Sequence, residues 1–225
     1  MPNDRAEQQP SLVTIHFQLI GMATDWKKDL KQFYFPSGKT VVDVLVPKMN
    51  FLMVDGEGNP NTSKTYQGAI MALYSMAYTL KFDLKKRDPS MDFRVGPLEG
   101  LWWNTDQGAL VLGNKDDWRW TAMIMVPDFI TLEMATAAKK AAAQKKDLPE
   151  LPKLHMESYD EGRAAQIMYV GPYVDEGPTI ERIHWFIQEM GGTLKGKHHE
   201  IYLSDPRRTL LEKLKTVIRQ PFQQS

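Results

Sequence analysis

The side chains best suited to chemistry lie near the end of the chain, in residues 198–208, which alternate like a β-strand before Asp-Pro. Glu200 and Tyr202 are two residues apart, with aliphatic residues at the intervening parity. Because successive side chains of a strand point to opposite faces, the carboxylate and the phenol share one face. A buried carboxylate is unfavourable unless it is paired or functional. The pair therefore predicts a pocket for a flat organic ligand, basic or electrophilic; the alternative is a solvated face, or pairing of Glu200 with a nearby arginine or with His198.

A second candidate carboxylate is Glu99, in the segment PLEGLWW. On a strand, Glu99, Leu101 and Trp103 share parity, which puts a charge beside two apolar groups. The neighbouring Gly100 permits close approach of another backbone or marks a bulge. Glu99 therefore predicts a second acid of the site, and the alternative is a salt bridge at its rim.

Six tryptophans occur in the chain, and four of them belong to two predicted neighbouring strands: Trp102, Trp103, Trp118 and Trp120. Indole rings stack on planar ligands and on cations. The cluster predicts aromatic walls for the ligand, whereas the alternative for each ring is ordinary core packing.

Composition excludes several other kinds of chemistry. The 225 residues include no cysteine, so disulfides, thiolate metal sites and a cysteine nucleophile are excluded. The 28 basic and 28 acidic side chains balance, which does not favour a nucleic-acid partner. The five histidines have no metal-ligand spacing, and the Gly-x-Gly of residues 56–58 lacks the context of a phosphate-binding loop. We expect no metal and no cofactor.

The elements that must position these groups follow from periodicity and turn residues. The sequence predicts helices over 24–33, 64–82, 131–146, 179–190 and 209–219, and strands over 41–46, 50–54, 93–103, 118–126 and 163–170, with another strand ending at residue 203. The helix over 64–82 is apolar on two sides, which favours burial between layers, and the alanine-rich helix over 131–146 is expected to be an exposed connector. Strand–helix–strand order occurs twice, over about 50–126 and 162–204, which indicates a repeat.

The beginning of the chain gives little structural signal. The apolar stretch over 12–23 is too short and too polar to span a bilayer, and the charges before it have both signs, unlike a signal peptide. We expect residues 1–23 to be a loose extension. A hydrophobic content of 42% over this length suffices for one large domain or two small fused ones.

Several of these motifs together resemble the GyrI-like small-molecule-binding proteins, specifically their free-standing bacterial branch. The matching stretches are residues 56–61, 73–78, 97–103, 126–129, 170–173, 199–207 and 212–219, within a match that covers about 24–222. The resemblance implies an α+β fold: two strand–helix–strand–strand (SHS2-type) modules related by a pseudo-twofold, with a ligand cleft between them. It implies a single domain over 24–225, with modules at about 40–130 and 154–222.

The resemblance also implies a function. In drug-sensing relatives, an acid on the last strand of the second module meets cationic aromatic ligands, and Glu200 matches that position. One free-standing subclass, the cyclopropanoid cyclopropyl hydrolases, opens the strained ring of DNA-alkylating natural products of the yatakemycin and CC-1065 type. This chain looks more like that subclass, because nothing in it resembles a DNA-binding domain. The expectation is a cytoplasmic hydrolase for self-protection or detoxification, monomeric or homodimeric, with an aromatic small-molecule ligand, no nucleic acid and no membrane.

These implications assign roles to the candidate residues. Glu200, or else Glu99, would orient and deprotonate the water. A tyrosine would donate to the developing oxyanion: Tyr202, Tyr169 or Tyr173. The remaining residues would contact the ligand, with Trp102, Trp103 and Trp120 stacking on it and Met71 and Tyr74 forming the floor. Two competing functions stay open: a non-catalytic binder that sequesters or senses aromatic or cationic drugs, and an inhibitor-like protein that binds another protein such as a topoisomerase.

Overall fold

The computed structural model describes residues 25–104, 110 and 113–224. Its strands are β1 (Val42–Val46), β2 (Met49–Glu57), β3 (Leu98–Trp103), β4 (Arg119–Val126), β5 (His155–Tyr159), β6 (Gly162–Val170), β7 (Gly192–Leu194), β8 (His198–Tyr202) and β9 (Lys215–Gln224). Its α-helices are α1 (Trp26–Asp29), α2 (Lys31–Tyr34), α3 (Lys64–Arg87), α4 (Leu132–Lys145) and α5 (Gly177–Glu189). The α+β prediction is confirmed. In the part of the chain described, no helix is long and apolar enough to cross a membrane.

The strands form an antiparallel sheet in the order β1-β6-β9-β8-β3-β4-β2-β5, and β7 pairs with β9 in addition. Two sets of elements follow the same path: β2, α3, β3, β4 and then β6, α5, β8, β9. In each set the second strand is followed across the sheet by the third strand and then by the first. The sets meet where β3 pairs with β8, with Gly100 opposite Glu200. The strand before each set pairs with the other set, since β1 lies beside β6 and β5 beside β2.

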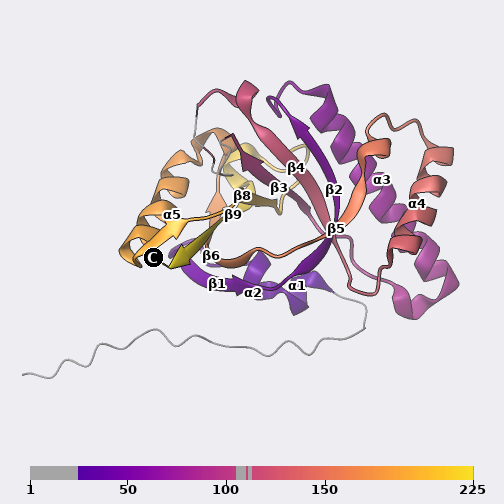
Figure 1. The fold of residues 1–225 in the computed structure, drawn as a ribbon, viewed down its shortest axis with the longest axis horizontal. Helices are drawn as coiled ribbons and strands as arrows, with labels where there is room; N and C mark the ends of the chain where they lie inside the picture. Colours follow the sequence, from indigo (N-terminus) through magenta and orange to yellow (C-terminus); the bar gives the residue numbers. More distant parts are fainter. Residues whose placement is uncertain (1–24, 105–109, 111–112, 225) are drawn as a thin grey trace, which may run out of the picture.

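The long helices of both sets cover one face of this sheet, with α3 and α4 at one end and α5 at the other (Figure 1). That both share a face follows from the pairing register, in which six residues stand opposite one another in successive strands: Ile167, Ile218, Glu200, Gly100, Ala122 and Val54. At one end of this row, Val54 and Ala122 pack in the core beneath α3. At the other end, Ile167 and Ile218 pack in the core beneath α5. Glu200 and Gly100 therefore lie in the middle of the helix-covered face.

The helices α3, α4 and α5 form where the sequence predicts them, with two differences. Ser63 caps α3 by accepting a hydrogen bond from the backbone N–H of Tyr66 at 3.1 Å, and α3 continues to Arg87. The helix α4 is not an exposed connector. Its alanines at positions 135, 138 and 142 are buried, and they pack with α3 in one core. Small side chains at this spacing let the two helices approach closely.

The opposite face of the sheet is covered by the N-terminal segment. The predicted single helix over 24–33 is two short helices, α1 and α2, broken at Leu30. They bury Phe33 and Tyr34 completely, in a core shared with residues of β2, β3, β8 and β9. Residues 1–23 fall outside the described residues, so the prediction made for them stays a prediction.

The predicted last helix, over 209–219, is wrong. After a 3₁₀ turn at Leu211–Lys213 the chain becomes β9, which pairs with β6 on one side and β8 on the other. Its consecutive β-branched residues, Thr216, Val217 and Ile218, favour a strand, and two ladders of hydrogen bonds outweigh the helical periodicity. The strand β5 was also not predicted, and β3 begins at Leu98 rather than at residue 93.

Candidate functional site

The central acid of the site is Glu200, in the middle of β8. It is 8% exposed and faces the side of the sheet that carries α3 and α5. Its cross-strand partner is Gly100, and a Cβ atom at Gly100 would lie 2.7 Å from Nε1 of Trp102. Only glycine at this position lets the Trp102 indole fold back over the strand next to Glu200. The sequence motif Glu-Gly-Leu-Trp thus has a packing reason.

A chain of hydrogen bonds leads from this indole to the carboxylate. Nε1 of Trp102 donates to the hydroxyl of Tyr202 at 3.1 Å, and that hydroxyl donates to Oε2 of Glu200 at 2.7 Å. Each donor points toward Glu200, which stabilises negative charge there. Burial, followed by the charge of Glu200, raises the pKa of Tyr202 well above its ordinary value, so the phenol keeps its proton.

Other buried polar groups gather around Glu200 without satisfying one another. His198 is 1% exposed and its Nε2 lies 3.4 Å from Oε1 of Glu200, yet neither ring nitrogen makes a hydrogen bond within the described residues. The same holds for Oε1 of Glu176, which is 4% exposed, and for the hydroxyl of Thr216. Buried polar atoms are normally paired. Several unpaired polar atoms beside a buried carboxylate make this place the candidate site for the polar groups of a ligand.

The second acid of this cluster is Glu176, at the start of α5. Burial first, and then the charge of Glu200, raise its pKa to about 9, although the Thr216 hydroxyl and Lys115 act in the opposite direction. Its side chain makes no capping hydrogen bond to the helix. Two acids that share a buried site do not both ionise readily, since each charge disfavours the other. Near neutral pH, Glu176 therefore holds a proton.

Aromatic rings enclose the acids. The ring of Tyr173 meets that of Tyr202 edge-on, at 5.5 Å between centroids. Burial, with Glu176 and Glu200, raises the pKa of Tyr173 to about 12. On the other side, Tyr66 from α3 packs against Trp102 at 5.5 Å. One aromatic group from each set of elements thus lies close to Glu200.

Of the residues predicted for the site, the structure brings together Glu200, Tyr202, Trp102 and Tyr173. Tyr74 is half-buried against the core beneath α3, on the side near Asp205 and Arg207. Trp120 is fully buried and packs edge-on against Tyr66 at 4.9 Å, so it supports the wall from behind.

Of the other predicted residues, Glu99, Trp103 and Met71 lie elsewhere, whereas Tyr169 lies near Glu176 with its hydroxyl engaged. Glu99 is opposite Ile201, so it is on the other face of the sheet, and Trp103 shares that face, with Nζ of Lys197 3.6 Å from its ring centroid. Met71 is 47% exposed on α3 and forms no floor. The hydroxyl of Tyr169, on β6, donates to the carbonyl of Pro172 at 2.9 Å. The expectation that Glu99 and Trp103 share a cleft with Glu200 is wrong, because the register of β3 against β8 places Gly100, and not Glu99, opposite Glu200.

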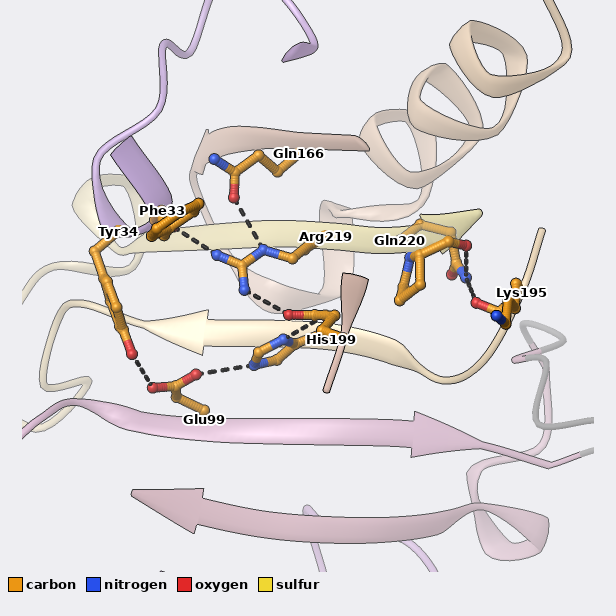
Figure 2. A network of polar contacts seen from close by, with 10 residues as sticks. Phe33, Tyr34, Glu99, Gln166, Lys195, His199, Arg219 and Gln220 are labelled. Carbon is orange, nitrogen blue, oxygen red and sulfur yellow. Dashed lines mark hydrogen bonds and ion pairs between the residues drawn. The ribbon is translucent and has the colours of Figure 1, made fainter. Parts of the chain in front are cut away.

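Glu99 belongs instead to a fully buried network on the opposite face (Figure 2). One carboxylate oxygen accepts from the hydroxyl of Tyr34 at 2.7 Å, and the other lies 3.0 Å from Nε2 of His199. Nδ1 of His199 lies 2.8 Å from Glu161, whose second oxygen accepts from Arg219 at 2.7 Å. Each charged group here faces one of opposite sign.

The electrostatics of this network follow from its pairing. Burial alone lowers the pKa of His199, but Glu161 and Glu99 raise it above the ordinary value. Burial alone raises the pKa of Glu161, but His199 and Arg219 overcome this and lower it to about 2. Arg219 also donates to the carbonyl of Phe33 at 2.7 Å. The network therefore ties α2 to the sheet behind β8.

Sequence reasoning missed two residues of the site, Glu176 and Tyr66. Its alternative partner for Glu200, His198, does lie within ion-pair distance, 3.4 Å from Oε1, although without a hydrogen bond. The alternative pairing of Glu200 with Arg207 or Arg208 is not found, because both arginines face Asp205. The sequence predicted a turn and an amphipathic helix within residues 171–190. It could not predict that Glu176 is buried, because that burial depends on how α5 packs on the sheet. Within the described residues, no group of three or more histidine, aspartate or glutamate side chains could hold a metal ion.

Comparisons with known proteins agree with this geometry. The profile of the GyrI-like small molecule binding domain matches residues 41–223. A conserved protein of uncharacterised function from Listeria innocua is 41% identical, with a TM-score of 0.81 over 88% of this chain and 98% of its own. A hydrolase from Listeria innocua is 39% identical, with a TM-score of 0.77 over 88% and 98% of the two chains.

More distant structures share only the fold. The C-terminal domain of EcmrR is 10% identical, with a TM-score of 0.52 over 83% of this chain and 98% of that domain. Among curated proteins, none matches the chain.

Proposed function

The chain belongs to the family of GyrI-like small-molecule-binding domains, and from this premise we propose that it is a hydrolase that adds water to the cyclopropane ring of cyclopropanoid, DNA-alkylating compounds. The similar Listeria protein described as a hydrolase supports an enzymatic function. Opening such compounds removes their alkylating group, so the activity would protect or detoxify the cell. Water addition of this kind requires no cofactor.

The observation that supports the proposal most is the buried Glu200 with its oriented donors. Oε2 is held by the hydroxyl of Tyr202, and Oε1 faces His198 at 3.4 Å without a hydrogen bond. A carboxylate fixed on one oxygen can position a water molecule with the other and accept its proton. General-base assistance of this type accelerates a reaction by ~10²–10⁴-fold.

The aromatic residues account for the shape of the proposed substrate. Cyclopropanoid compounds of this class carry a cyclopropane fused to a flat cyclohexadienone. The rings of Trp102 and Tyr173 both contact Tyr202, the hydrogen-bond partner of Glu200, and stacking on these rings would present the cyclopropane carbon to the water on Glu200. Positioning of the two reactants contributes a large part of such rate accelerations.

The test is direct. Purified protein is mixed with a synthetic pyrroloindole that bears the cyclopropane-fused cyclohexadienone, and ring opening is followed by absorbance and by mass. We expect wild type to accelerate ring opening and Glu200→Gln to lose ~10²–10⁴-fold of the acceleration. Glu189→Gln, the same substitution at an exposed acid of α5, should keep the wild-type rate. Absence of acceleration by wild type would overturn the hydrolase function.

One observation favours a second function, the sequestration of aromatic or cationic drugs without chemistry. Two acids, Glu176 and Glu200, lie among aromatic rings, and such surroundings attract cations. In that case an aromatic cation should quench tryptophan fluorescence saturably and be recovered unchanged. Saturable quenching together with turnover would favour the hydrolase instead.

A further inference from the structure

We propose that Glu176 is a second catalytic carboxyl of this site, the acid that delivers a proton to the ligand's carbonyl oxygen while Glu200 takes one from water. This inference rests on the proposed function and deepens it. It assigns opposite roles to two carboxyl groups on the basis of their different surroundings.

Two donors of the site are already engaged and are not available to the developing oxyanion. The indole N–H of Trp102 is used on Tyr202, and the hydroxyl of Tyr202 is used on Glu200. Sequence reasoning assigned the oxyanion to Tyr202, Tyr169 or Tyr173, but in the structure the Tyr202 hydroxyl donates to the base and the Tyr169 hydroxyl donates to the carbonyl of Pro172. An acid placed next to Glu200 and not engaged elsewhere would fill this role.

Glu176 meets both conditions. It is almost completely buried, and its Oε1 has no hydrogen-bond partner within the described residues. Its carboxyl lies beside the Thr216 hydroxyl, without a hydrogen bond of normal geometry between them. Thr216 is the cross-strand partner of Tyr202. Glu176 is therefore held above the strands that carry the Glu200–Tyr202 pair, with an oxygen free for a ligand.

The charges facing Glu176 favour its neutral form. Glu200 on β8 repels a second negative charge, and the phenols of Tyr169, Tyr173 and Tyr202 carry none at neutral pH. The one cation among these groups is Lys115, whose effect on the pKa of Glu176 is weaker than that of burial or of Glu200.

Glu176 is also a stronger acid than the phenol of Tyr173. Its pKa of about 9 lies closer to that of an ordinary phenol, about 10, than does the pKa of about 12 of Tyr173. Proton transfer from Glu176 to a phenolate oxygen is thus nearly balanced in energy, which suits a general acid.

The reaction balances with these two groups alone. The water oxygen bonds to the cyclopropane CH₂ carbon, and the water proton goes to Glu200. The bond between that carbon and the spiro carbon breaks, and its electron pair moves through the dienone to the carbonyl oxygen. That oxygen takes the proton of Glu176 and becomes the phenol hydroxyl. Glu200 then holds one proton and Glu176 none, and transfer of that proton from Glu200 to Glu176 restores the starting state.

The first experiment needs no substrate. Glutamate carboxyl groups labelled with ¹³C are titrated by NMR in wild type, Glu176→Gln and Glu200→Gln. We expect one carboxyl to titrate near pH 9 in wild type, its signal to be absent from Glu176→Gln, and its midpoint to fall in Glu200→Gln because the repelling charge is removed. If the signal lost in Glu176→Gln titrates below about pH 6 in wild type, near the ordinary glutamate range, the inference is overturned.

The second experiment follows ring opening of the synthetic pyrroloindole against pH. For wild type, kcat should fall on the alkaline side as Glu176 loses its proton. Glu176→Gln should keep KM, lose about 10²-fold in kcat, at the lower end of general acid catalysis, and lose the alkaline fall. Glu189→Gln should behave as wild type does.

The outcomes separate the two proposals. An active wild type together with an equally active Glu176→Gln overturns the role of Glu176 and leaves the hydrolase function standing. A wild type that opens no ring overturns the hydrolase function, and with it the role of Glu176 as a proton donor, even if its carboxyl titrates near pH 9.

Discussion

Replacing Glu176 by glutamine should make the protein more stable, and the gain should grow as the pH rises from 5 to 7. The pKa of Glu176 is about 9 in the folded chain, against 4.5 for an ordinary glutamate. Between these two values the folded chain binds a proton that the unfolded chain releases, so the wild type loses stability as the pH rises. Glutamine has the shape of the protonated acid and does not titrate, so the variant is spared this loss.

The magnitude follows from the two pKa values. One pKa unit corresponds to ~1.4 kcal/mol, so between pH 5 and pH 7 the wild type should lose about 2–3 kcal/mol of unfolding free energy relative to Glu176→Gln. In a chain of this length that is equivalent to a difference in Tm of roughly 5–10 °C.

The assay is urea unfolding of both proteins at pH 5, 6 and 7, monitored by tryptophan fluorescence and circular dichroism. Glu189→Gln, at an exposed position of α5, is the control and should change the unfolding free energy by no more than ~0.5 kcal/mol at any pH. A Glu176→Gln variant less stable than wild type at pH 7, or a difference that does not change with pH, would refute the argument that Glu176 is a proton-holding acid.

Three further outcomes are expected. Glu161→Gln leaves the Arg219 cation buried without its carboxylate, and should lower the unfolding free energy in urea by about 3–5 kcal/mol; because the folded pKa of Glu161 is about 2, this contribution is present above pH 4.5 and should be lost as the pH falls toward 2. Tyr202→Phe removes the donor that orients the base, and should lower kcat for ring opening by about 10²-fold with little change in KM; an unchanged kcat would show that the phenol is dispensable. Ala142→Leu overfills the contact between α4 and α3 and should lower Tm by about 2–10 °C, from an overpacking cost of about 1–3 kcal/mol. The control is leucine at the exposed position 143, which should leave Tm unchanged. If leucine at position 142 is tolerated as well as leucine at position 143, the packing of α4 against α3 is contradicted.

Local patterns along the chain were sufficient to predict most elements and the central pair of the site. Strand alternation by itself puts Glu200 and Tyr202 on one face, and their hydroxyl–carboxylate hydrogen bond confirms that they meet. The helices α3 and α5 were predicted from apolar spacing, since a helix that buries one stripe needs a 3.6-residue period whatever it packs against. The motif Glu-Gly-Leu-Trp belongs to the family resemblance, but the packing of the Trp102 indole over Gly100, which explains it, appears only in the structure.

The relation between strands could not be read in the same way. Glu99 and Glu200 are both buried acids on strands, and their parities alone do not say whether they share a face. That depends on the register of β3 against β8, which pairs Gly100 with Glu200 and sends Glu99 to the network of His199. Register between distant strands is fixed by the packing of the whole sheet, and a shift of one residue would exchange the two faces.

The sequence by itself determined which side chains alternate and which helices are amphipathic, and thereby that Glu200 and Tyr202 share one face. The tertiary structure alone decided that residues 215–224 are a strand, because two neighbouring ladders stabilise it there. It alone decided that Glu176 is an acid of the site, because the packing of α5 removes that carboxyl from water and brings it to Glu200. The physical reason is common to both: periodicity is local, whereas desolvation and strand pairing depend on residues far apart in the chain.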